Sequence, residues 1–255
     1  MSSDSAPRVG IVGYGEIGSA VAALFRRRGL PEPIVHDPAL GMKSAAADAD
    51  VVHVCVPGPA VEAVVTGRET RLWIVHSTVR VGTCRAIASR VRGRVVHAPV
   101  RGVHPNLVAG LEAFTMPVGG PRDGVETAVE HLTQLGVRAV PFGPWENTEL
   151  GKLLCTLRYG MDILFMRHAA ELCAQYGADF ERVYTEWTKQ YSDGFEMLGQ
   201  WWFRRAVLKP MPGAIGGHCV VPNARLLAAD SELAQFVADA GAEPWTPPAG
   251  LKVAP

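Results

Sequence analysis

The sequence lacks the patterns that mark membrane, secreted and metal-binding proteins. No apolar run reaches the roughly 18 residues that span a bilayer, and the start, MSSDSAPR, has no apolar core of a signal peptide. The five cysteines are scattered and form no Cys-x-x-Cys pair, so neither a disulfide framework nor a zinc site is indicated. These absences predict a cytoplasmic protein with free thiols, no membrane contact and no bound metal.

An excess of charge of either sign is also missing. Lys+Arg and Asp+Glu both number 25, so no global basic field argues for a nucleic-acid partner. With 48% apolar and 20% charged residues, the composition is typical of a globular protein with a well-buried core. A length of 255 residues is enough for one or two domains.

Short runs rich in Val and Ile alternate with helical runs over the first half of the chain. Because these strands show no clean alternation, we expect them to be buried on both faces of a parallel sheet. The candidate strands are residues 8–14, 33–37, 51–57, 72–78, 94–100 and 138–143. The expected fold class is therefore α/β, a doubly wound Rossmann-type sheet.

The second half reads as helix, beginning with one long run from Asn147 to about Tyr176. More helix is expected at 180–191 and 231–241, and the last residues are rich in proline. We therefore expect a dinucleotide-binding domain at 1–145, a small all-helical substrate and dimerisation domain at 146–240, and an irregular tail at 241–255.

The stretch GYGEIG follows the first strand and opens a helix. Gly13 permits a tight turn, Gly15 allows a pyrophosphate to approach the backbone, and Gly18 allows close packing of helix and strand. Asp37 lies 19 residues past Gly18, at the end of the next strand, where a carboxylate binds a ribose and repels a 2′-phosphate. The pattern predicts NAD, although His36 tolerates a phosphate; the alternative is an ordinary α/β turn with a surface Asp.

Ligands of open α/β sheets lie beyond the carboxyl ends of the strands. Two further candidate strands end in CVPGP and HSTVRVGT. The second of these ends places Thr78 near the nicotinamide or a reacting hydroxyl. An equally common role for Ser77 and Thr78 is to cap the loop. The full set expected to bind the cofactor is Gly13, Gly15, Glu16, Ile17, Gly18, Asp37, Val56, Pro57, Ser77 and Thr78.

Lys152, Thr156 and Tyr159 share one stripe of the long, largely apolar helix. A desolvated lysine there would suit acid–base chemistry; a lysine snorkelling from an exposed edge is the more common outcome of such spacing. Farther on, the glycines of GAIGGHC allow the loop to approach a ligand, so that Cys219 could attack an aldehyde. A small buried hydrophobe is the usual role of a free cysteine.

Five segments together resemble one family, the nucleotide-sugar 6-dehydrogenases (UDP-glucose and UDP-N-acetylhexosamine dehydrogenases) of the 6-phosphogluconate dehydrogenase-like superfamily. These segments occur in the family's order over residues 8 to about 228, and the histidine before Cys219 is more similar to the N-acetylhexosamine branch. They are GYGEIG, ADVVHVCVPGP, STVRVGT, the long run from NTELGK to QYGAD, and GAIGGHC.

The resemblance implies a four-electron oxidation of a primary alcohol to an acid with two NAD. Cys219 matches the family's nucleophile, Lys152 its oxyanion-stabilising and proton-transferring lysine, and Thr78 the threonine of its Ser-Thr loop. The resemblance further implies a long helix that packs against its partner in a homodimer. Residues 201–203 could form part of an interface or cover the cleft, and a core role for them is equally open.

The sequence departs from the family at three partner positions. Thr156 replaces an asparagine, Asn223 replaces an aspartate, and Val100 replaces a glutamate after Pro99. Asn223 cannot act as a base in thioester hydrolysis. The printed sequence also ends before the family's UDP-binding domain. We therefore consider a substrate held by the stretch HAPVRGVHPN instead. Its His97, Arg101 and His104 could bind a carboxylate or phosphate, or could be ordinary loop residues.

Three functions remain open on this basis. One is an NAD-dependent dehydrogenase acting on the hydroxyl of a small or nucleotide-linked substrate, with catalytic residues Lys152, Cys219, Thr78, Thr156 and Asn223. The second is a two-electron dehydrogenase or reductase similar to the β-hydroxyacid dehydrogenases, and the third a catalytically quiet NAD-binding regulatory protein. The residues expected to bind substrate are Arg101, His104, Tyr159, Gly216, Gly217 and His218.

Overall fold

The computed structural model describes residues 7–66, 68–102, 106–217 and 219–253. The chain divides into two compact units, Met1–Lys152 and Leu153–Pro255, and each is described by itself.

The first unit is built on a five-stranded sheet in the order β2-β1-β3-β4-β5, with every neighbouring pair parallel. The order places β1 between β2 and β3, which is the arrangement of a doubly wound sheet. The predicted fold class is confirmed. The strands are β1 (Val9–Val12), β2 (Ile34–His36), β3 (Val51–Val54), β4 (Glu69–Val75) and β5 (Arg92–His97).

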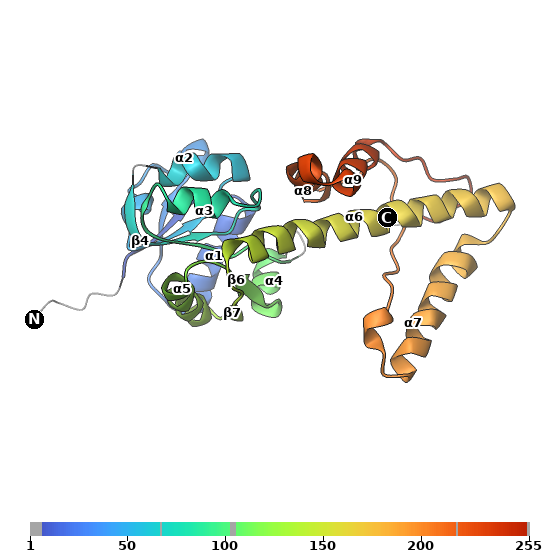
Figure 1. Ribbon diagram of the computed structural model, residues 1–255, viewed down its shortest axis with the longest axis horizontal. Coiled ribbons are helices and arrows are strands. Elements are labelled where there is room, and N and C mark those ends of the chain that lie inside the picture. Colours follow the sequence, from blue (N-terminus) through green and yellow to red (C-terminus); the bar gives the residue numbers. More distant parts are fainter. Residues whose placement is uncertain (1–6, 67, 103–105, 218, 254–255) are drawn as a thin grey trace, which may run out of the picture. The chain divides into compact units, whose positions relative to one another are not determined.

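Helices cover both faces of this sheet (Figure 1). On one face, α1 (Glu16–Arg27), α4 (Leu107–Ala113) and α5 (Arg122–Gln134) bury an apolar cluster that includes Leu24 and Ile74. On the other face, α2 (Val61–Val65) and α3 (Thr83–Ala88) bury a second cluster around Trp73. Burial on both sides explains why the strand sequences are continuous apolar runs.

The strand predicted at 138–143 does not join the main sheet. It forms β7 (Ala139–Pro141), which pairs in parallel with β6 (Met116–Val118) in a separate two-stranded sheet. An isolated antiparallel bridge between His97 and Gly119 connects the end of β5 to the end of β6. Each of the two strands holds only three residues and one proline, which limits the ladder they can form.

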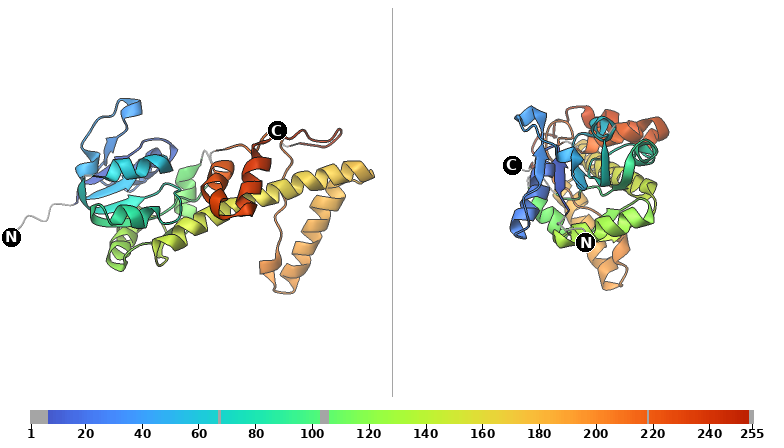
Figure 2. Two further views of the ribbon diagram at one scale, coloured as in Figure 1. Left: turned by 45° about the horizontal axis from the view of Figure 1, so that its top comes forward. Right: turned by 90° about the vertical axis from the view of Figure 1, so that its left-hand side faces the viewer.

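Helix α6 (Trp145–Tyr176) runs for 32 residues and contributes its first turns to the first unit. In the second unit, α8 (Val220–Leu227) and α9 (Glu232–Ala242) lie beside α6 (Figure 2). Their shared core includes Leu153, Leu157 and Val237. A packed helical layer of this kind is what the apolar residues of α6 require.

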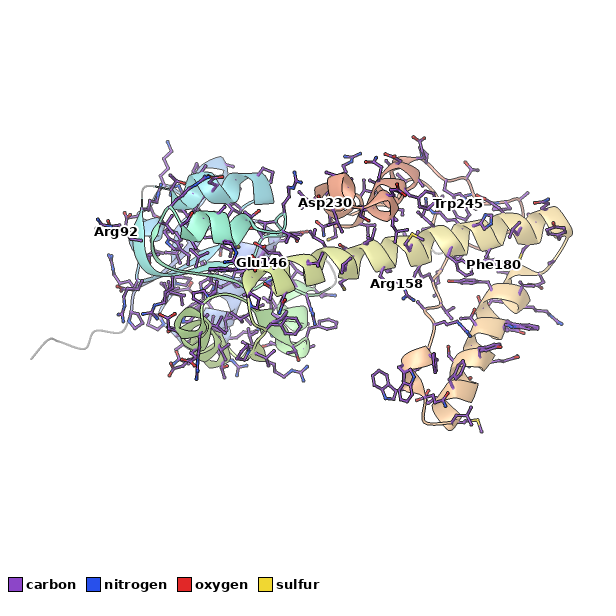
Figure 3. The ribbon with its side chains drawn as sticks, in the orientation of Figure 1. Arg92, Glu146, Arg158, Phe180, Asp230 and Trp245 are labelled. Atoms are coloured by element: carbon purple, nitrogen blue, oxygen red, sulfur yellow. The ribbon has the colours of Figure 1, made fainter. Side chains whose placement is uncertain are left out.

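After α6, the chain of the second unit continues into two shorter helical segments. A π-helical stretch, Glu181–Glu186, leads into α7 (Trp187–Met197). Beyond Ala242 the described residues form no helix, but Trp245 makes an antiparallel bridge to Gly213, and its indole donates to Glu171 over 2.8 Å (Figure 3). In the described part of the chain, no helix is both long enough and apolar enough to span a bilayer.

Candidate functional site

The glycine turn after β1 has the geometry that its spacing predicts. Gly13 adopts a φ of +88°, and its N–H donates to the carbonyl of His36 over 2.9 Å. A Cβ at Gly18 would lie 1.9 Å from the carbonyl oxygen of Gly13, so helix and turn touch there. A Cβ at Gly15 would meet nothing within 4 Å. Two glycines are thus needed for packing, and the third leaves open space above the turn.

That open space lies at the N-terminus of α1. Gly15 is the N-cap residue and no side chain caps it, while Glu16 and Ile17 begin the helix. The first N–H groups of a helix have no acceptor within the helix and carry its positive dipole end. The turn therefore fits an anionic group such as a pyrophosphate.

Asp37 reaches from the end of β2 to the same turn. Its Oδ2 accepts from the N–H of Tyr14 over 2.7 Å, and its Oδ1 accepts from the N–H of Ala39 over 3.1 Å. The neighbouring His36 is engaged on Nδ1 by the backbone of Ser44, at 2.9 Å from its carbonyl oxygen. The carboxylate is thus held beside the glycine turn, at the edge where a ribose is expected.

The loops after β3 and β4 are packed against each other. Ser77 is buried and its hydroxyl donates to the carbonyl of Val56 over 2.5 Å, while a Cβ at Gly58 would lie 2.4 Å from the carbonyl oxygen of Thr78. Pro57 is exposed and Thr78 is half-buried. Ser77 therefore holds the loop, and Thr78 beside it is partly exposed.

Lys152 lies at the end of the first unit and is half-buried. Its Nζ donates to the carbonyl of Val100 over 3.0 Å, just beyond the end of β5. The ammonium group is therefore held at the carboxyl edge of the sheet rather than extended from an exposed edge of the helix.

In the second unit, Cys219 is half-buried at the N-cap of α8. Gly216 and Gly217 precede it and are exposed, and Gly217 has a φ of +82°. One turn into the helix, Asn223 is buried, and its Nδ2 donates to Thr156 Oγ1 over 3.2 Å. Two of the three residues at which the sequence departs from the resembled family are thus bonded to each other.

The remaining predicted substrate residues belong to two different units, and two of them are outside the part of the chain that the structure describes. Arg101 is exposed and Tyr159 is half exposed; His104 and His218 lie outside the described residues. His97 is fully buried, with Nε2 3.1 Å from the carbonyl oxygen of Ser77 and Nδ1 2.8 Å from Thr148 Oγ1. Since both its ring nitrogens are engaged, His97 supports the loop and is not an anion ligand.

Sequence reasoning missed a chain of three histidines in the first unit, in which His53 and His76 are buried and His131 is half-buried. His53 Nδ1 lies 2.9 Å from His76 Nε2, and His53 Nε2 lies 2.9 Å from His131 Nε2. Burial lowers the pKa of His76, His97 and His131 to about 4, and lowers the pKa of His53 below its ordinary value, with the neighbouring histidines adding to the effect. All four rings are therefore neutral near pH 7. A signal was present, because a histidine stands in the apolar run of each of three adjacent strands.

Glu149 is the second residue that was missed. It is fully buried on α6, where its two carboxylate oxygens accept from the N–H groups of Gly82 and Cys84, over 2.7 and 2.8 Å. Among the described residues, no three His, Cys, Asp or Glu side chains are arranged to hold a metal ion.

Several solved structures are similar to this chain in fold. A UDP-D-ManNAc dehydrogenase from Pyrococcus horikoshii superposes with a TM-score of 0.66 and 19% identity, covering 92% of this chain and 68% of that one. A 3-hydroxyisobutyrate dehydrogenase from Mycobacterium tuberculosis gives 0.63 and 18%, covering 91% of each chain. A UDP-glucose dehydrogenase from Pyrobaculum islandicum gives 0.63 and 19%, covering 94% and 69%.

The chain shares its doubly wound fold and long helix with these dehydrogenases. The matched structures include both UDP-sugar dehydrogenases and 3-hydroxyisobutyrate dehydrogenases, so the likeness establishes the architecture without choosing a substrate. No protein-family model matches the chain, and no curated protein sequence matches it significantly.

Proposed function

We propose that this protein is an NAD-dependent oxidoreductase that oxidises a hydroxyl group of a small or nucleotide-linked substrate. The observation that carries the proposal is the uncapped, open N-terminus of α1 above Gly15, with the carboxylate of Asp37 bonded beside it. Glu16, Ile17, Val56, Pro57 and Thr78 complete the proposed cofactor-binding edge.

NAD is favoured over NADP by Asp37. A carboxylate at the end of β2 accepts hydrogen bonds from the two ribose hydroxyls and repels a 2′-phosphate. Because its Oδ2 already accepts from Tyr14, the group is fixed in place before any ligand arrives.

Lys152 is the proposed acid–base residue. The bound nicotinamide would supply the chemistry of hydride acceptance from the carbinol carbon. The lysine Nζ, held by Val100 at the carboxyl edge of the sheet, would exchange the hydroxyl proton. Thr78, in the loop after β4, would orient the reacting group through its hydroxyl.

Cys219 decides between two forms of this activity. A cysteine nucleophile would allow a second oxidation to a thioester, whose hydrolysis needs a base. Asn223 has no basic group, and its amide is bonded to Thr156. These observations favour two-electron oxidation, as in β-hydroxyacid dehydrogenases, and keep the four-electron reaction as the second candidate.

The yield of NADH per substrate separates the two candidates. We would supply NAD with UDP-hexoses, UDP-N-acetylhexosamines and small hydroxy acids, and compare Cys219→Ala with Cys155→Ala, a cysteine on the exposed side of α6. One NADH per substrate, unchanged in both variants, would support two-electron chemistry. Two NADH, lost only in Cys219→Ala, would establish the four-electron reaction. NAD binding without turnover of any substrate would favour the regulatory alternative.

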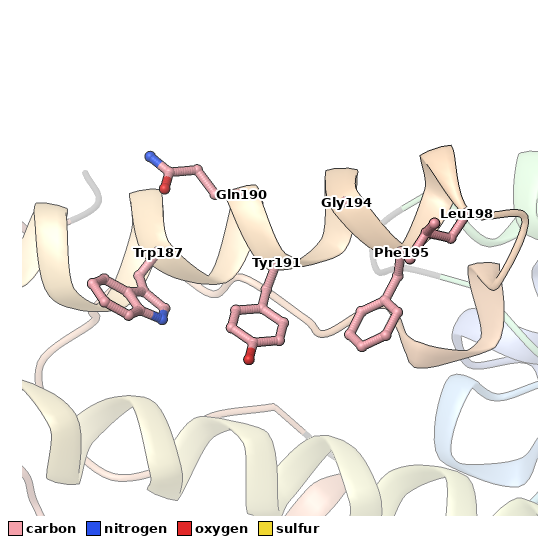
Figure 4. A pocket seen from close by; sticks show the side chains of 6 residues that line it. All are labelled: Trp187, Gln190, Tyr191, Gly194, Phe195 and Leu198. Atoms are coloured by element: carbon pink, nitrogen blue, oxygen red, sulfur yellow. The ribbon is translucent and has the colours of Figure 1, made fainter.

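We further propose that the protein forms a homodimer through its second unit. A groove of about 410 Å³ on α7 is lined by six residues. Figure 4 shows that the three aromatic rings among them project from the same side of the helix. The lining is Trp187, Gln190, Tyr191, Gly194, Phe195 and Leu198. This groove contains none of the residues proposed for chemistry, and its apolar lining is typical of a protein interface.

The second unit exposes further large apolar side chains besides those that line the groove. Outside the groove, Trp201, Trp202 and Phe203 are each at least half exposed, which excludes a core role for them, and Phe165 and Tyr176 on α6 are more than half exposed. Trp187, Tyr191 and Leu198 of the groove lining are also about half exposed or more. Large exposed apolar side chains of this kind are typical of a protein interface.

A further inference from the structure

Glu149 is a buried carboxylate of α6 that holds a loop of the first unit. It is 0% exposed, and each of its oxygens accepts one backbone N–H, from Gly82 over 2.7 Å and from Cys84 over 2.8 Å. Burial of a charged carboxylate is costly unless charge-assisted hydrogen bonds compensate it. The carboxylate and the two N–H groups therefore form a fixed connection between α6 and the start of α3.

The loop that Glu149 holds is the one that carries Thr78. It runs from the end of β4 at Val75 to the start of α3 at Thr83. Gly82 is the N-cap of α3, has a φ of +89°, and provides no capping side chain of its own. The first N–H groups of α3 are therefore capped by the Glu149 carboxylate from α6 and not by a side chain of the loop itself. This contact fixes the end of the loop that joins α3.

The neighbouring residue of α6 fixes the near end of the same loop. Thr148 Oγ1 lies 2.8 Å from His97 Nδ1, and His97 Nε2 lies 3.1 Å from the carbonyl oxygen of Ser77. Because a carbonyl only accepts, Nε2 carries the proton, and Nδ1 of the neutral ring is an acceptor. The Thr148 hydroxyl, which also lies 2.9 Å from the carbonyl oxygen of Trp145, shares its one proton between these two acceptors. Thr148 and Glu149 therefore hold the residues on either side of Thr78.

The strand order indicates what this loop faces. The glycine turn follows β1 and Asp37 follows β2, so the adenosine end of a dinucleotide belongs at the β2 side. The other end must then extend past β3 toward β4, where Thr78 lies. The loop held by Glu149 is on the nicotinamide side of the proposed cofactor site.

We propose that Glu149, with Thr148 and His97, is a positioning residue that sets the loop bearing Thr78 against the nicotinamide half of the cofactor. This rests on the proposed function, because it requires that NAD binds at this edge. Glu149 itself touches neither cofactor nor substrate in this role. Its effect is expected on the half of the ligand that faces the Thr78 loop, and not on the adenosine half.

Two ligands separate these halves: NADH, and ADP-ribose, which has no nicotinamide. In Glu149→Gln, one carboxylate oxygen becomes an NH₂ group that faces a backbone N–H, so the loop loses one of its two bonds. The Kd for NADH is expected to rise about tenfold, the loss typical of a hydrogen bond to a charged group, with the Kd for ADP-ribose unchanged. Calorimetric titration measures both.

Glu146 provides a matched control on the same pair of helices. Its carboxylate pairs with Arg85 of α3, with Nε 2.6 Å from Oε1, but it lies at the surface and does not bond the loop (Figure 3 labels Glu146). Glu146→Gln should leave both Kd values unchanged. Thr148→Val, which replaces the hydroxyl by a methyl group, should reproduce the selective loss of NADH binding. This variant tests the positioning role if Glu149→Gln does not fold.

Equal loss of both ligands in the folded Glu149→Gln or Thr148→Val variant, or no loss of either, would overturn the positioning role. If the wild-type protein bound neither NADH nor ADP-ribose, the proposed function would fail first, and this inference with it. Selective loss of NADH binding, absent in Glu146→Gln, would confirm it.

Discussion

The rings of His53 and His76 are nearly parallel in the first unit, with an interplanar angle of 8°, and meet edge to edge through a hydrogen bond of 2.9 Å between Nδ1 and Nε2. His76 Nδ1 lies 2.7 Å from the carbonyl oxygen of Ala98, so it must donate there. In neutral rings, His53 Nδ1 then donates to His76 Nε2, and His131 Nε2 donates to His53 Nε2. The chain is complete only while Nε2 of His53 and Nε2 of His76 carry no proton, because these two nitrogens are the acceptors.

This chain predicts that the fold loses stability in mild acid. The unfolded histidines take up protons near pH 6.5, whereas burial lowers the folded pKa of His76, His97 and His131 to about 4. Stability is therefore complete above about pH 6.5 and falls as the pH drops toward 4. At pH 5 each such histidine costs about 2 kcal/mol of unfolding free energy.

Urea denaturation at pH 7.5 and pH 5.0 measures this effect. His131→Gln, which removes one titrating ring, should reduce the loss at pH 5.0 relative to wild type. His168→Gln is the control, because His168 is exposed on α6. A free energy of unfolding that is equal at the two pH values would show that the rings are not held neutral.

The glycine turn predicts opposite results for two similar substitutions. Gly15→Ala places a methyl group in open space, so the melting temperature should stay within a degree or two, while the Kd for NADH should rise by about tenfold or more because the methyl group occupies the place of the pyrophosphate. Gly18→Ala places its methyl group 1.9 Å from the carbonyl oxygen of Gly13 and should lower the melting temperature. Unchanged NADH binding by Gly15→Ala would exclude this turn as the phosphate site.

Asp37 predicts the choice between the two nicotinamide cofactors. Asp37→Asn keeps the shape of the side chain and removes the charge that repels a 2′-phosphate. The ratio of the Kd for NADPH to the Kd for NADH should fall about tenfold. Asp50→Asn is a suitable control, since Asp50 also accepts a backbone N–H, from Arg8, but at the opposite end of the strands. An unchanged ratio in Asp37→Asn would mean that the carboxylate does not face the ribose.

The apolar groove on α7 predicts that a single substitution changes the oligomeric state. Trp187→Ser removes a 65% exposed indole from the groove lining, so it should leave the helical content unchanged and raise the dimer dissociation constant at least tenfold, as expected for a tryptophan at an interface. Light scattering over a range of micromolar concentrations measures this. A wild-type protein that is monomeric throughout that range would refute the dimer.

The cofactor half of the fold was predictable because its signals are local. The spacing of Gly13, Gly15 and Gly18 and the apolar strands each describe one short segment, and the structure confirms the doubly wound sheet built from them. Strand β6 was missed because three residues with a central proline give no periodic pattern. Helix α8 was missed because its first residues follow a glycine-rich loop and include Pro222.

The contacts that organise the site were not predictable from spacing. Glu149 reads as an ordinary acidic residue near the start of a helix, and only the packing of α6 on α3 turns it into a buried acceptor for the N–H groups of Gly82 and Cys84. The spacing around Lys152 is equally compatible with a lysine in a cleft and a lysine at an exposed edge of the helix. Its bond to the carbonyl of Val100 depends on a residue 52 positions away in the chain. Long-range contacts of this kind arise from tertiary structure alone.

The distribution of the five thiols makes the second unit open to selective labelling. Cys84 and Cys173 are buried, and burial raises the pKa of the Cys55 and Cys84 thiols, so these groups are shielded from alkylation at neutral pH. Cys155 is exposed and Cys219 is half-buried. In a Cys155→Ser background, a maleimide dye would therefore attach at Cys219, and its emission would report ligand binding at the glycine-rich loop without any assay of turnover.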